Sequence, residues 1–367
     1  MESVMEAPRQ AQPLPQPLAL ATISQLRCFG ECPRKEHYAY QLGARRRLTD
    51  DDPRSYGTLA HKLVEEWWKT RGDLDVCLDA LAALTVEPYI AAKARAFIVG
   101  YHHRWHAELA HFEVIAVEVR FEMPLRNPET GRESRTFRVG GKIDVVVHYD
   151  GTDPRSLREP GIYVIEHKSS SEDIGAGSPY WVKLKLDGQV SLYLDGAATI
   201  TGKPVQGCIY DVFRRPAQRP TQMPVLDDDG VKIVLDATGQ RVRTKDGKKW
   251  RQTADAEAGY VLQTRPETPE EFFARIADAI AEQPDEYFRR GDVLRLEEEL
   301  DEFRFDFWQR ARVMREAHLA NRAPRIVESC FKFNRPCDFL PVCLREASID
   351  DPFLYERITT QHPELRD

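Results

Sequence analysis

The fold is decided by Gly140-Gly141-Lys142-Ile143-Asp144-Val145-Val146-Val147 and by the later stretch Val164-Ile165-Glu166-His167-Lys168. Both stretches are rich in β-branched residues, which favour buried strands, and each carries one acid next to its apolar run. Lys168 shares a face with Glu166 because side chains alternate along a strand. Carboxylate oxygens are the ligands that Mg²⁺ and Mn²⁺ prefer. The two strands therefore predict a divalent-metal site with a lysine beside it.

The surrounding sequence predicts an α/β fold. Hydrophobic periodicity indicates helices at 23–42, opened by Ser24 as N-cap, and at 56–70 and 87–109. Strands are expected at 111–123, 136–149 and 161–168, followed by a helix at 179–199 and a strand at 206–214. A helical N-terminal layer, three strands, a helix and a further strand make a mixed α/β core.

The remaining sequence divides into a tail, an insertion and a helical segment. Residues 1–20 contain Pro/Gln repeats and are expected to be a disordered tail. Polar, turn-rich residues 217–263 predict a β-hairpin insertion. Helices are expected to resume with a capping box at Thr268, and a long helix at about 292–320 leads to the last cysteines, so that 264–345 forms a helical segment.

Composition indicates a globular, cytoplasmic protein. The chain has 367 residues, 42% hydrophobic and 30% charged, which is ample for a buried core. It has no apolar run of about 18 residues and no signal sequence at its N-terminus, so no membrane association is expected. The net charge of −7 does not favour nucleic-acid binding, although a local basic face is sufficient for it. Candidate basic runs, each of which could equally be a solvated surface, are Arg45-Arg46-Arg47, Arg214-Arg215 with Arg219, and Lys245, Lys248, Lys249 and Arg251.

The polar residues suit hydrolysis of a phosphodiester. Asp144 and Glu166 can supply metal ligands, to which the backbone carbonyl of His167 can add an oxygen. Lys168 can orient or deprotonate a water, or neutralise developing charge. His61, in Gly57-Thr58-Leu59-Ala60-His61, is a further candidate ligand, and Gln189 and Tyr193 share one helix face at i and i+4. Each of these last three residues could instead pack or cap a helix; their combination and order favour the catalytic interpretation.

The seven cysteines are unevenly distributed. Cys330, Cys337 and Cys343 form a C-x6-C-x5-C cluster, and Cys28 and Cys32 lie near the start. In a cytoplasmic chain such a cluster predicts metal or iron–sulfur ligation before disulfides. Cys77 and Cys208 stand alone and are expected to be core residues.

The order G-x-x-x-H, G-x-x-D, E-x-K, Q-x-x-x-Y resembles the RecB-type branch of the PD-(D/E)xK nuclease superfamily. The resemblance covers about residues 23–215 and the terminal cysteines. It implies a restriction-endonuclease-like core, a mixed central sheet flanked by helices, within a single domain at 21–367. It also implies roles for the residues quoted above: metal binding by His61, Asp144 and Glu166, catalysis by Lys168, and DNA contact by Gln189 and Tyr193.

The cysteines extend the resemblance. Ser24-x-Leu26 followed by Cys32-Pro33-Arg34-Lys35 resembles the opening motif of iron–sulfur members, seen in CRISPR-associated RecB-like exonucleases and AddB-type helicase–nucleases. This implies a [4Fe–4S] cluster held by Cys32, Cys330, Cys337 and Cys343. The C-x6-C spacing is longer than the C-x2-C expected from the CRISPR members, so residues 331–336 would have to loop around the cluster. A Cys₄ zinc site, unligated thiols, and Cys28 in place of Cys32 remain alternatives.

The resulting expectation is a Mg²⁺- or Mn²⁺-dependent DNA exonuclease acting on single strands or DNA ends, stabilised by the cluster. It would act in recombination and repair or in CRISPR adaptation, beside an annealing protein or a CRISPR integrase. The chain has no Walker A motif, so no ATP-driven motor is expected within it. Two alternatives are a non-cleaving DNA-binding module with a structural iron–sulfur or zinc site that acts as a partner subunit, and a zinc-stapled interaction domain with incidental carboxylates.

Overall fold

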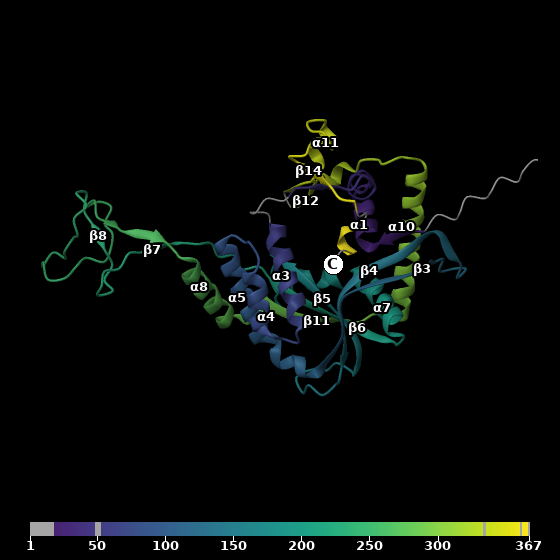
Figure 1. Ribbon diagram of the computed structural model, residues 1–367, viewed down its shortest axis with the longest axis horizontal. Coiled ribbons are helices and arrows are strands. Elements are labelled where there is room, and N and C mark those ends of the chain that lie inside the picture. The colour runs from purple at the N-terminus through teal and green to yellow at the C-terminus, as the bar shows by residue number, and fades with distance from the viewer. Residues whose placement is uncertain (1–17, 48–52, 333–334, 360–361, 366–367) are drawn as a thin grey trace, which may run out of the picture.

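A six-stranded mixed sheet forms the centre of the computed structural model, which describes residues 18–47, 53–332, 335–359 and 362–365 (Figure 1). Its strands are β1 (Ala19–Thr22), β3 (Phe112–Arg126), β4 (Glu133–Tyr149), β5 (Gly161–Ser170), β6 (Val205–Arg214) and β11 (Phe288–Val293). The order is β1-β4-β5-β6-β11, and β3 lies along the other edge of β4. The β1–β4 and β5–β6 pairs are parallel and the others are antiparallel. The expected mixed central sheet is confirmed.

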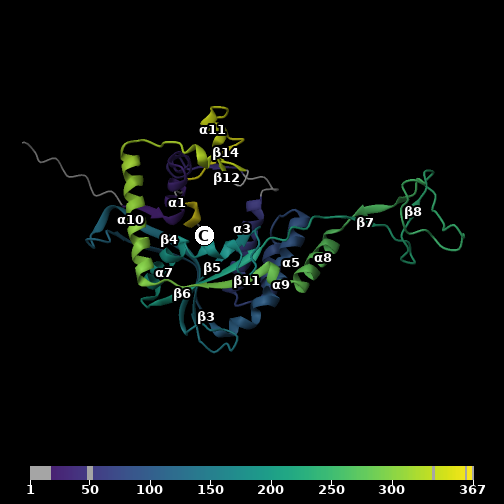
Figure 2. The same ribbon diagram turned by 180° about the vertical axis from the view of Figure 1, so that it is seen from behind.

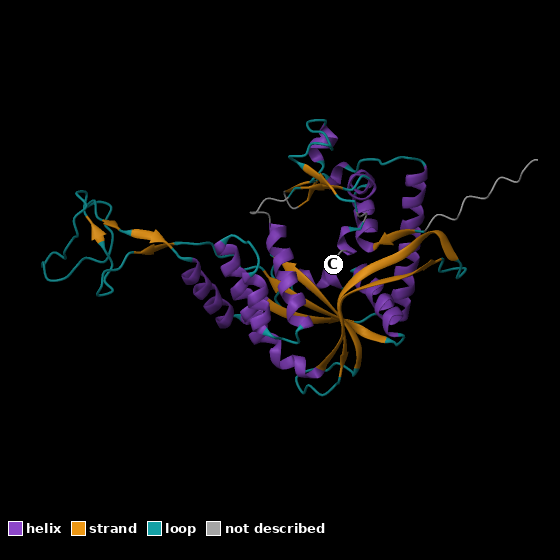
Figure 3. Ribbon diagram, viewed as in Figure 1, coloured by secondary structure: helices purple, strands orange, loops and turns teal. Residues whose placement is uncertain are grey.

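Helices cover both faces of the sheet (Figure 3). One face packs against α3 (Pro53–Lys69), α4 (Leu74–Ala82), α5 (Pro88–Trp105) and α8 (Pro269–Glu282). Val145, Val147 and Ile165 point into this core, which also holds Trp67 and Trp68. The alternate residues of the same strands point the other way because of the two-residue period.

The opposite face packs against α1 (Ile23–Glu31), α7 (Gly188–Thr201) and α10 (Glu297–Leu319). Val146, Val164 and Tyr210 from the strands meet Tyr193 of α7 and Phe307 of α10 in this second core. Strands β4 and β5 are thus buried on both faces, as their almost continuous apolar sequence requires.

A small lobe joins the two ends of the described chain. It contains α2 (Pro33–Glu36), η1 (His37–Gln41), β2 (Ala44–Arg46), η3 (Val327–Ser329), β12 (Phe331–Lys332), β13 (Arg335–Pro336), α11 (Leu340–Leu344), β14 (Tyr355–Arg357) and η4 (Pro363–Leu365). β14 pairs with β2, and Tyr40, Phe339 and Tyr355 form its core. Its η4 contacts β4 of the central sheet.

A long arm at residues 222–266 projects away from the body (Figure 2). Two short antiparallel pairs form it, β7 (Gln222–Pro224) with β10 (Thr264–Pro266) and β8 (Val234–Leu235) with β9 (Val261–Leu262). The expected hairpin insertion at 217–263 corresponds to this arm.

The structure corrects five expectations. The helix expected at 23–42 breaks at Cys32, which is extended at φ −164° because Pro33 disfavours a helical residue before it, and Thr22 rather than Ser24 caps α1. The helix expected at 179–199 is two helices, α6 (Pro179–Leu184) and α7. The segment expected to be helical at 264–345 contains strand β11, between α9 (Pro284–Tyr287) and α10. The expected tail reaches too far, because its last residues belong to β1.

Other expectations agree or cannot be compared. The capping box at Thr268 is present, with Glu271 as its acidic partner. Residues 1–17 of the expected tail lie outside the described residues. Within the described ranges, no helix combines the length and the apolar character needed to cross a bilayer.

Candidate active site

The candidate site lies in a fork of the sheet beside β4. One edge of β4 pairs with β1 through Phe137–Gly140 and with β5 from Val145 onward, so residues 141–144 have no strand on that edge. Asp144 occupies the fork and compensates for the interrupted ladder: its Oδ2 accepts a hydrogen bond of 2.8 Å from the backbone N–H of His167. The strand divergence therefore places the carboxylate of Asp144 beside the end of β5.

Glu166, Lys168 and Gln189 form a closed hydrogen-bond ring. Lys168 Nζ donates to Glu166 Oε1 at 2.5 Å and to Gln189 Oε1 at 2.9 Å. Gln189 Nε2 donates to Glu166 Oε1 and to Tyr193 Oη, both at 2.9 Å. The structure thus brings four of the expected residues into direct contact, and Gln189 fixes the lysine relative to the acid.

The start of α7 positions Gln189. Asp187 caps the helix by accepting the N–H of Gln189 at 3.0 Å, and Arg27 and Tyr210 donate to the same carboxylate at 2.6 and 3.0 Å. Tyr193, one turn later, contacts the Phe121 ring edge-to-face. Asp187 was not among the expected site residues; its place two residues before a helical Gln-x-x-x-Tyr is a signal for such a cap.

Gly141 of the strand motif has a packing role. A Cβ atom at this position would lie 2.6 Å from Phe121 and 3.2 Å from Tyr193. Glycine therefore allows α7, with Gln189 and Tyr193, to approach β4 closely.

Glu118 is a carboxylate of the site that the sequence reasoning missed. It lies in β3 opposite Asp144, at φ +52°, a left-handed conformation that non-glycine residues rarely adopt. Its carboxylate pairs with Lys142, and both residues line the same cleft as Asp144. No motif marks Glu118, because its position depends on a local departure from regular strand geometry.

His61 lines this cleft, which measures about 1070 Å³, together with Asp144, Glu118 and Arg215. The imidazole lies edge-to-face on Phe213, with ring centroids 5.2 Å apart. Burial, and then the charges of His167 and Lys168, lower its pKa to about 3. His61 is therefore a neutral imidazole at the mouth of the fork, the form that can bind a metal.

A smaller cavity of about 160 Å³ lies on the other side of Asp144 and is lined by Gln189, Tyr193 and Glu364. Glu364 also lines the larger cleft, and its Oε1 accepts a hydrogen bond of 2.6 Å from Thr22 Oγ1. This second unexpected acid comes from η4, far from the other site residues in sequence.

Ionisation of the two central carboxyl groups, Asp144 and Glu166, is unfavourable in the metal-free site. Burial, and then the charge of Glu118, raise the pKa of Asp144 to about 7. Burial, and then the charge of Asp144, raise the pKa of Glu166 to about 8. Burial alone would lower the pKa of Lys168, but the Glu166 carboxylate outweighs it and the net shift is upward. The site therefore favours a bound cation and a protonated lysine.

The donor set fits a divalent ion, although it is not closed around one. Glu166 is 3% exposed, and its Oε2 is buried with no hydrogen-bond partner. A buried carboxylate oxygen without a partner is costly unless an ion or water satisfies it. In the described ranges no three His, Cys, Asp or Glu side chains are arranged as an ion-binding group. Asp144 and Glu166 are the residues that would hold the ion.

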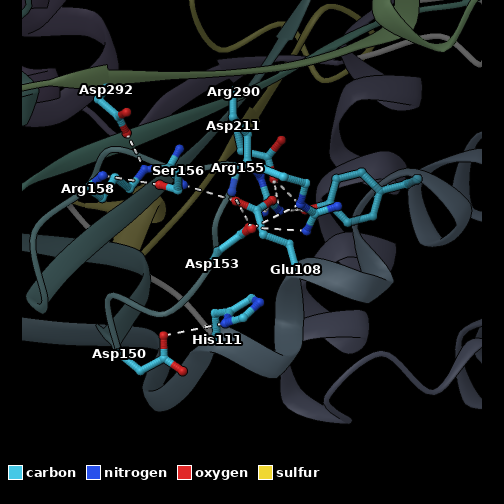
Figure 4. Close-up of polar contacts among 11 residues, drawn as sticks. Glu108, His111, Asp150, Asp153, Arg155, Ser156, Arg158, Asp211, Arg290 and Asp292 are labelled. Atoms are coloured by element: carbon cyan, nitrogen blue, oxygen red, sulfur yellow. Dashed lines mark hydrogen bonds and ion pairs between the residues drawn. The ribbon is translucent and has the colours of Figure 1, made fainter.

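The side chain of His167 contacts a buried charge network, of which Figure 4 shows Asp211, Arg290, Glu108 and Arg158. Its Nδ1 lies 3.4 Å from Oδ2 of Asp211, which is fully buried in β6. Arg290 of β11 bridges Asp211 at 3.0 Å and Glu108 at 2.7 Å, and Arg158 continues from Glu108 at 3.0 Å. Burial alone would raise the pKa of Asp211, but Arg290 holds it well below its usual range. At the site, His167 contributes its backbone N–H, which donates to Asp144. A role for its carbonyl stays a prediction.

Four of the cysteines gather in the lobe. Burial raises the pKa of the Cys343 thiol, and the nearby thiols of Cys337, Cys32 and Cys330 raise it further. The backbone N–H of Cys337 donates to the carbonyl of Cys330 at 2.8 Å, and none of the four forms a disulfide. Lys332 pairs with Glu31 at 2.8 Å, which holds β12 against the end of α1. Free thiols from both ends of the chain thus belong to one lobe, although within the described ranges no three of them are arranged as an ion-binding group.

Comparison with known proteins agrees with this arrangement. The family model described as the PD-(D/E)XK nuclease superfamily matches residues 21–343. The chain is also similar to one subunit of the ATP-dependent helicase/deoxyribonuclease of Moorella thermoacetica, with 27% identity over 245 residues. That alignment covers 56% of this chain and 20% of the relative, so the chain spans about a fifth of the relative's length.

Proposed function

The chain belongs to the PD-(D/E)XK nuclease superfamily, and on this premise we propose that it is a divalent-metal-dependent deoxyribonuclease. The observation that carries the proposal is the contact set of Glu166, Lys168 and Gln189 beside Asp144. Two carboxylates and an ammonium held at the fork of the sheet match the needs of phosphodiester hydrolysis.

Each residue has a proposed role. Asp144 and Glu166 hold Mg²⁺ or Mn²⁺, which lowers the pKa of water and stabilises charge on the phosphate. His61 and the carbonyl of His167 are candidate further ligands. Lys168 keeps its proton, since its pKa is raised, and places positive charge beside the reacting phosphate. Gln189 orients Lys168, and Tyr193 supports Gln189 and faces DNA.

The proposed substrate is single-stranded DNA or a DNA end, cut as an exonuclease. The name of the Moorella relative, which describes it as part of a deoxyribonuclease, supports DNA as the substrate class. We propose action in recombination and repair, with a helicase, annealing protein or CRISPR integrase as the kind of partner.

We also propose a [4Fe–4S] cluster on Cys32, Cys330, Cys337 and Cys343. Its support is the presence of four free thiols in the lobe, where the backbone N–H of Cys337 donates to the carbonyl of Cys330, since four thiolates complete the ligation of a cubane. When bound, the cluster would tie the N-terminal helices to the C-terminal segment.

The experiment is digestion of 5′- and 3′-labelled single- and double-stranded DNA by anaerobically purified protein, with Mg²⁺, Mn²⁺ or EDTA. Glu166→Ala is the test variant, and Glu122→Ala, an exposed acid of β3, is the matched control. Metal-dependent cutting that Glu166→Ala loses and Glu122→Ala keeps would establish the nuclease, and the label pattern its polarity. Cutting by Glu166→Ala would overturn the metal assignment. A folded parent that binds DNA without cutting it would be the non-cleaving module instead.

A further inference from the structure

The arm at 222–266 has eight basic and seven acidic residues, and its positive charge is concentrated in one segment. Its segment 241–251, Arg-Val-Arg-Thr-Lys-Asp-Gly-Lys-Lys-Trp-Arg, has six basic residues and one acidic residue in a chain whose net charge is −7. The segment lies on the part of the arm that projects from the body (Figure 1). Positive charge is therefore collected at a point remote from the fork.

The acids of the arm neutralise only part of this segment. Asp236 and Asp246 accept hydrogen bonds from their own turns, at 2.9 Å from Thr238 N and 3.2 Å from Lys248 N. Asp227 and Asp255 pair with arginines, Arg241 at 2.5 Å and Arg251 at 2.9 Å. Three exposed lysines have no carboxylate partner within the described chain: Lys245, Lys248 and Lys249.

The aromatic side chains of the arm are already occupied. The guanidinium groups of Arg241 and Arg243 lie 4.4 and 4.1 Å from the centre of the Trp250 ring, and Arg251 lies 5.0 Å from that of Tyr260. Proteins that bind single strands offer free aromatic faces on which bases stack. A slender two-stranded ribbon with exposed cations instead suits the phosphates and major groove of a duplex.

The root of the arm is fixed to the body and is itself basic. Buried Glu267 accepts the N–H of Thr221 at 3.0 Å and pairs with Arg275 of α8 at 2.7 Å. Burial, and then the nearby charges of Arg215 and Arg219, lower the pKa of Lys93 to about 8. Arg215 also lines the cleft of Asp144. Basic groups thus run from the cleft to the arm root.

We propose that the arm is a second DNA-binding site, which holds the phosphate backbone of double-stranded DNA outside the cleft. Lys245, Lys248 and Lys249 contact the phosphates, and Arg215 and Arg219 guide the strand between the arm and the fork. The inference rests on the proposed DNA substrate and adds that duplex is gripped away from the point of cutting.

The test compares Lys245→Ala/Lys248→Ala/Lys249→Ala with the parent in binding experiments. The probes are a fluorescein-labelled blunt DNA duplex and a single strand of the same length, titrated in EDTA at several salt concentrations. The control is Arg132→Ala/Arg135→Ala/Lys203→Ala, which removes equal charge from exposed residues outside the arm. Thermal melting checks that each variant folds.

The arm variant should bind duplex less tightly, and the slope of log K against log salt should fall by about 2 to 3, because each phosphate contact contributes about 0.9. Single-strand binding and single-strand cleavage should match the parent and the control. An unchanged duplex slope, an equal loss in the control, or an equal loss on single strands would each overturn the proposal. If the parent binds no DNA, the proposed function itself fails. If the parent binds DNA and the arm variant binds duplex as tightly as the parent does, the arm inference alone fails.

Discussion

At the scale of single residues, Glu118 offers a carboxylate to the cleft of Asp144 from a left-handed backbone position. Replacing it by glutamine keeps the shape and removes the charge that a cation beside Asp144 would feel. We expect Glu118→Gln to weaken Mn²⁺ binding by about 10- to 100-fold, as for other residues adjacent to metal ligands. The measurement is a titration of free Mn²⁺ by electron paramagnetic resonance at alkaline pH.

The control for Glu118 is Glu122→Gln, a change of the same kind in the same strand. Glu122 is exposed and lies 3.5 Å from Arg138, and it does not line the cleft of Asp144. Equal Mn²⁺ affinity in Glu118→Gln and Glu122→Gln would show that Glu118 does not contribute to the ion site.

The pKa values of Asp144 and Glu166 are raised to about 7 and about 8. They predict that the stability of the metal-free protein and its affinity for metal both depend on pH. Both values lie above those of the unfolded chain, so the metal-free fold loses stability as pH rises from about 4 through about 8. A metal must displace these protons, so its affinity should rise across that window and level off above it.

Calorimetry of Mn²⁺ binding in two buffers with different heats of ionisation counts the released protons. The parent should release protons at neutral pH, and Glu166→Gln should release fewer. Binding without proton release in the parent would contradict the assignment of these two carboxylates.

Several site residues could be predicted from the sequence because an acid beside an apolar strand is a local signal. Asp144, Glu166 and Lys168 are of this kind, and the structure places them together. Glu118 and Glu364 could not be predicted, because one depends on a distorted strand and the other on a long-range approach of η4. The hydrogen-bond ring through Gln189 was predicted only in part. The sequence predicts that Gln189 and Tyr193 share a helix face, but it does not predict the hydrogen bond between Gln189 and Glu166.

At the scale of elements, the fork of β4 depends on the register of its neighbours. The pairing of β4 with β1 ends at Gly140, and its pairing with β5 begins at Val145. The strands themselves were predictable from period and β-branched content. The order of the strands in the sheet was not predictable, since the parallel pairing of β1 and the edge position of β11 depend on contacts between segments far apart in the sequence. The break at Cys32 follows from Pro33 and could have been read from the sequence.

Arg290 joins β11 to the rest of the sheet, and its loss should be costly. Its side chain is 4% exposed and bridges Asp211 and Glu108. Arg290→Ala should lower the free energy of unfolding by about 3–5 kcal/mol, because it leaves the buried carboxylate of Asp211 without its arginine partner. Arg126→Ala, in an exposed pair with Glu133, should cost less than about 1 kcal/mol. Chemical denaturation of both variants measures the difference, and equal losses would contradict the structural role of the network.

At the scale of the whole molecule, the lobe brings both ends of the described chain together, and the proposed cluster would hold them there. Cys337→Ala should lower the melting temperature and abolish brown colour, because ligands more than 300 residues apart close a long loop of the unfolded chain. Iron content and visible absorbance measure the cluster, with Cys28→Ser as control.

If Cys32 is the N-terminal ligand, Cys28→Ser should keep its iron. Loss of iron in Cys28→Ser alone, with Cys32→Ser unaffected, would exchange the two roles. A colourless parent without iron would remove the cluster, and bound zinc would identify the alternative metal.

The arm also makes the chain divisible. Its turn at 244–249 presents exposed lysines to trypsin, and such loop tips are preferred sites of cleavage. A cut there would leave one fragment ending beyond β6 and another containing α8 and β11. Because β11 pairs with β6 along Phe288–Val293, the two fragments should elute together as one nicked particle. The gene could therefore be divided at the arm and expressed as two polypeptides that assemble into the same body.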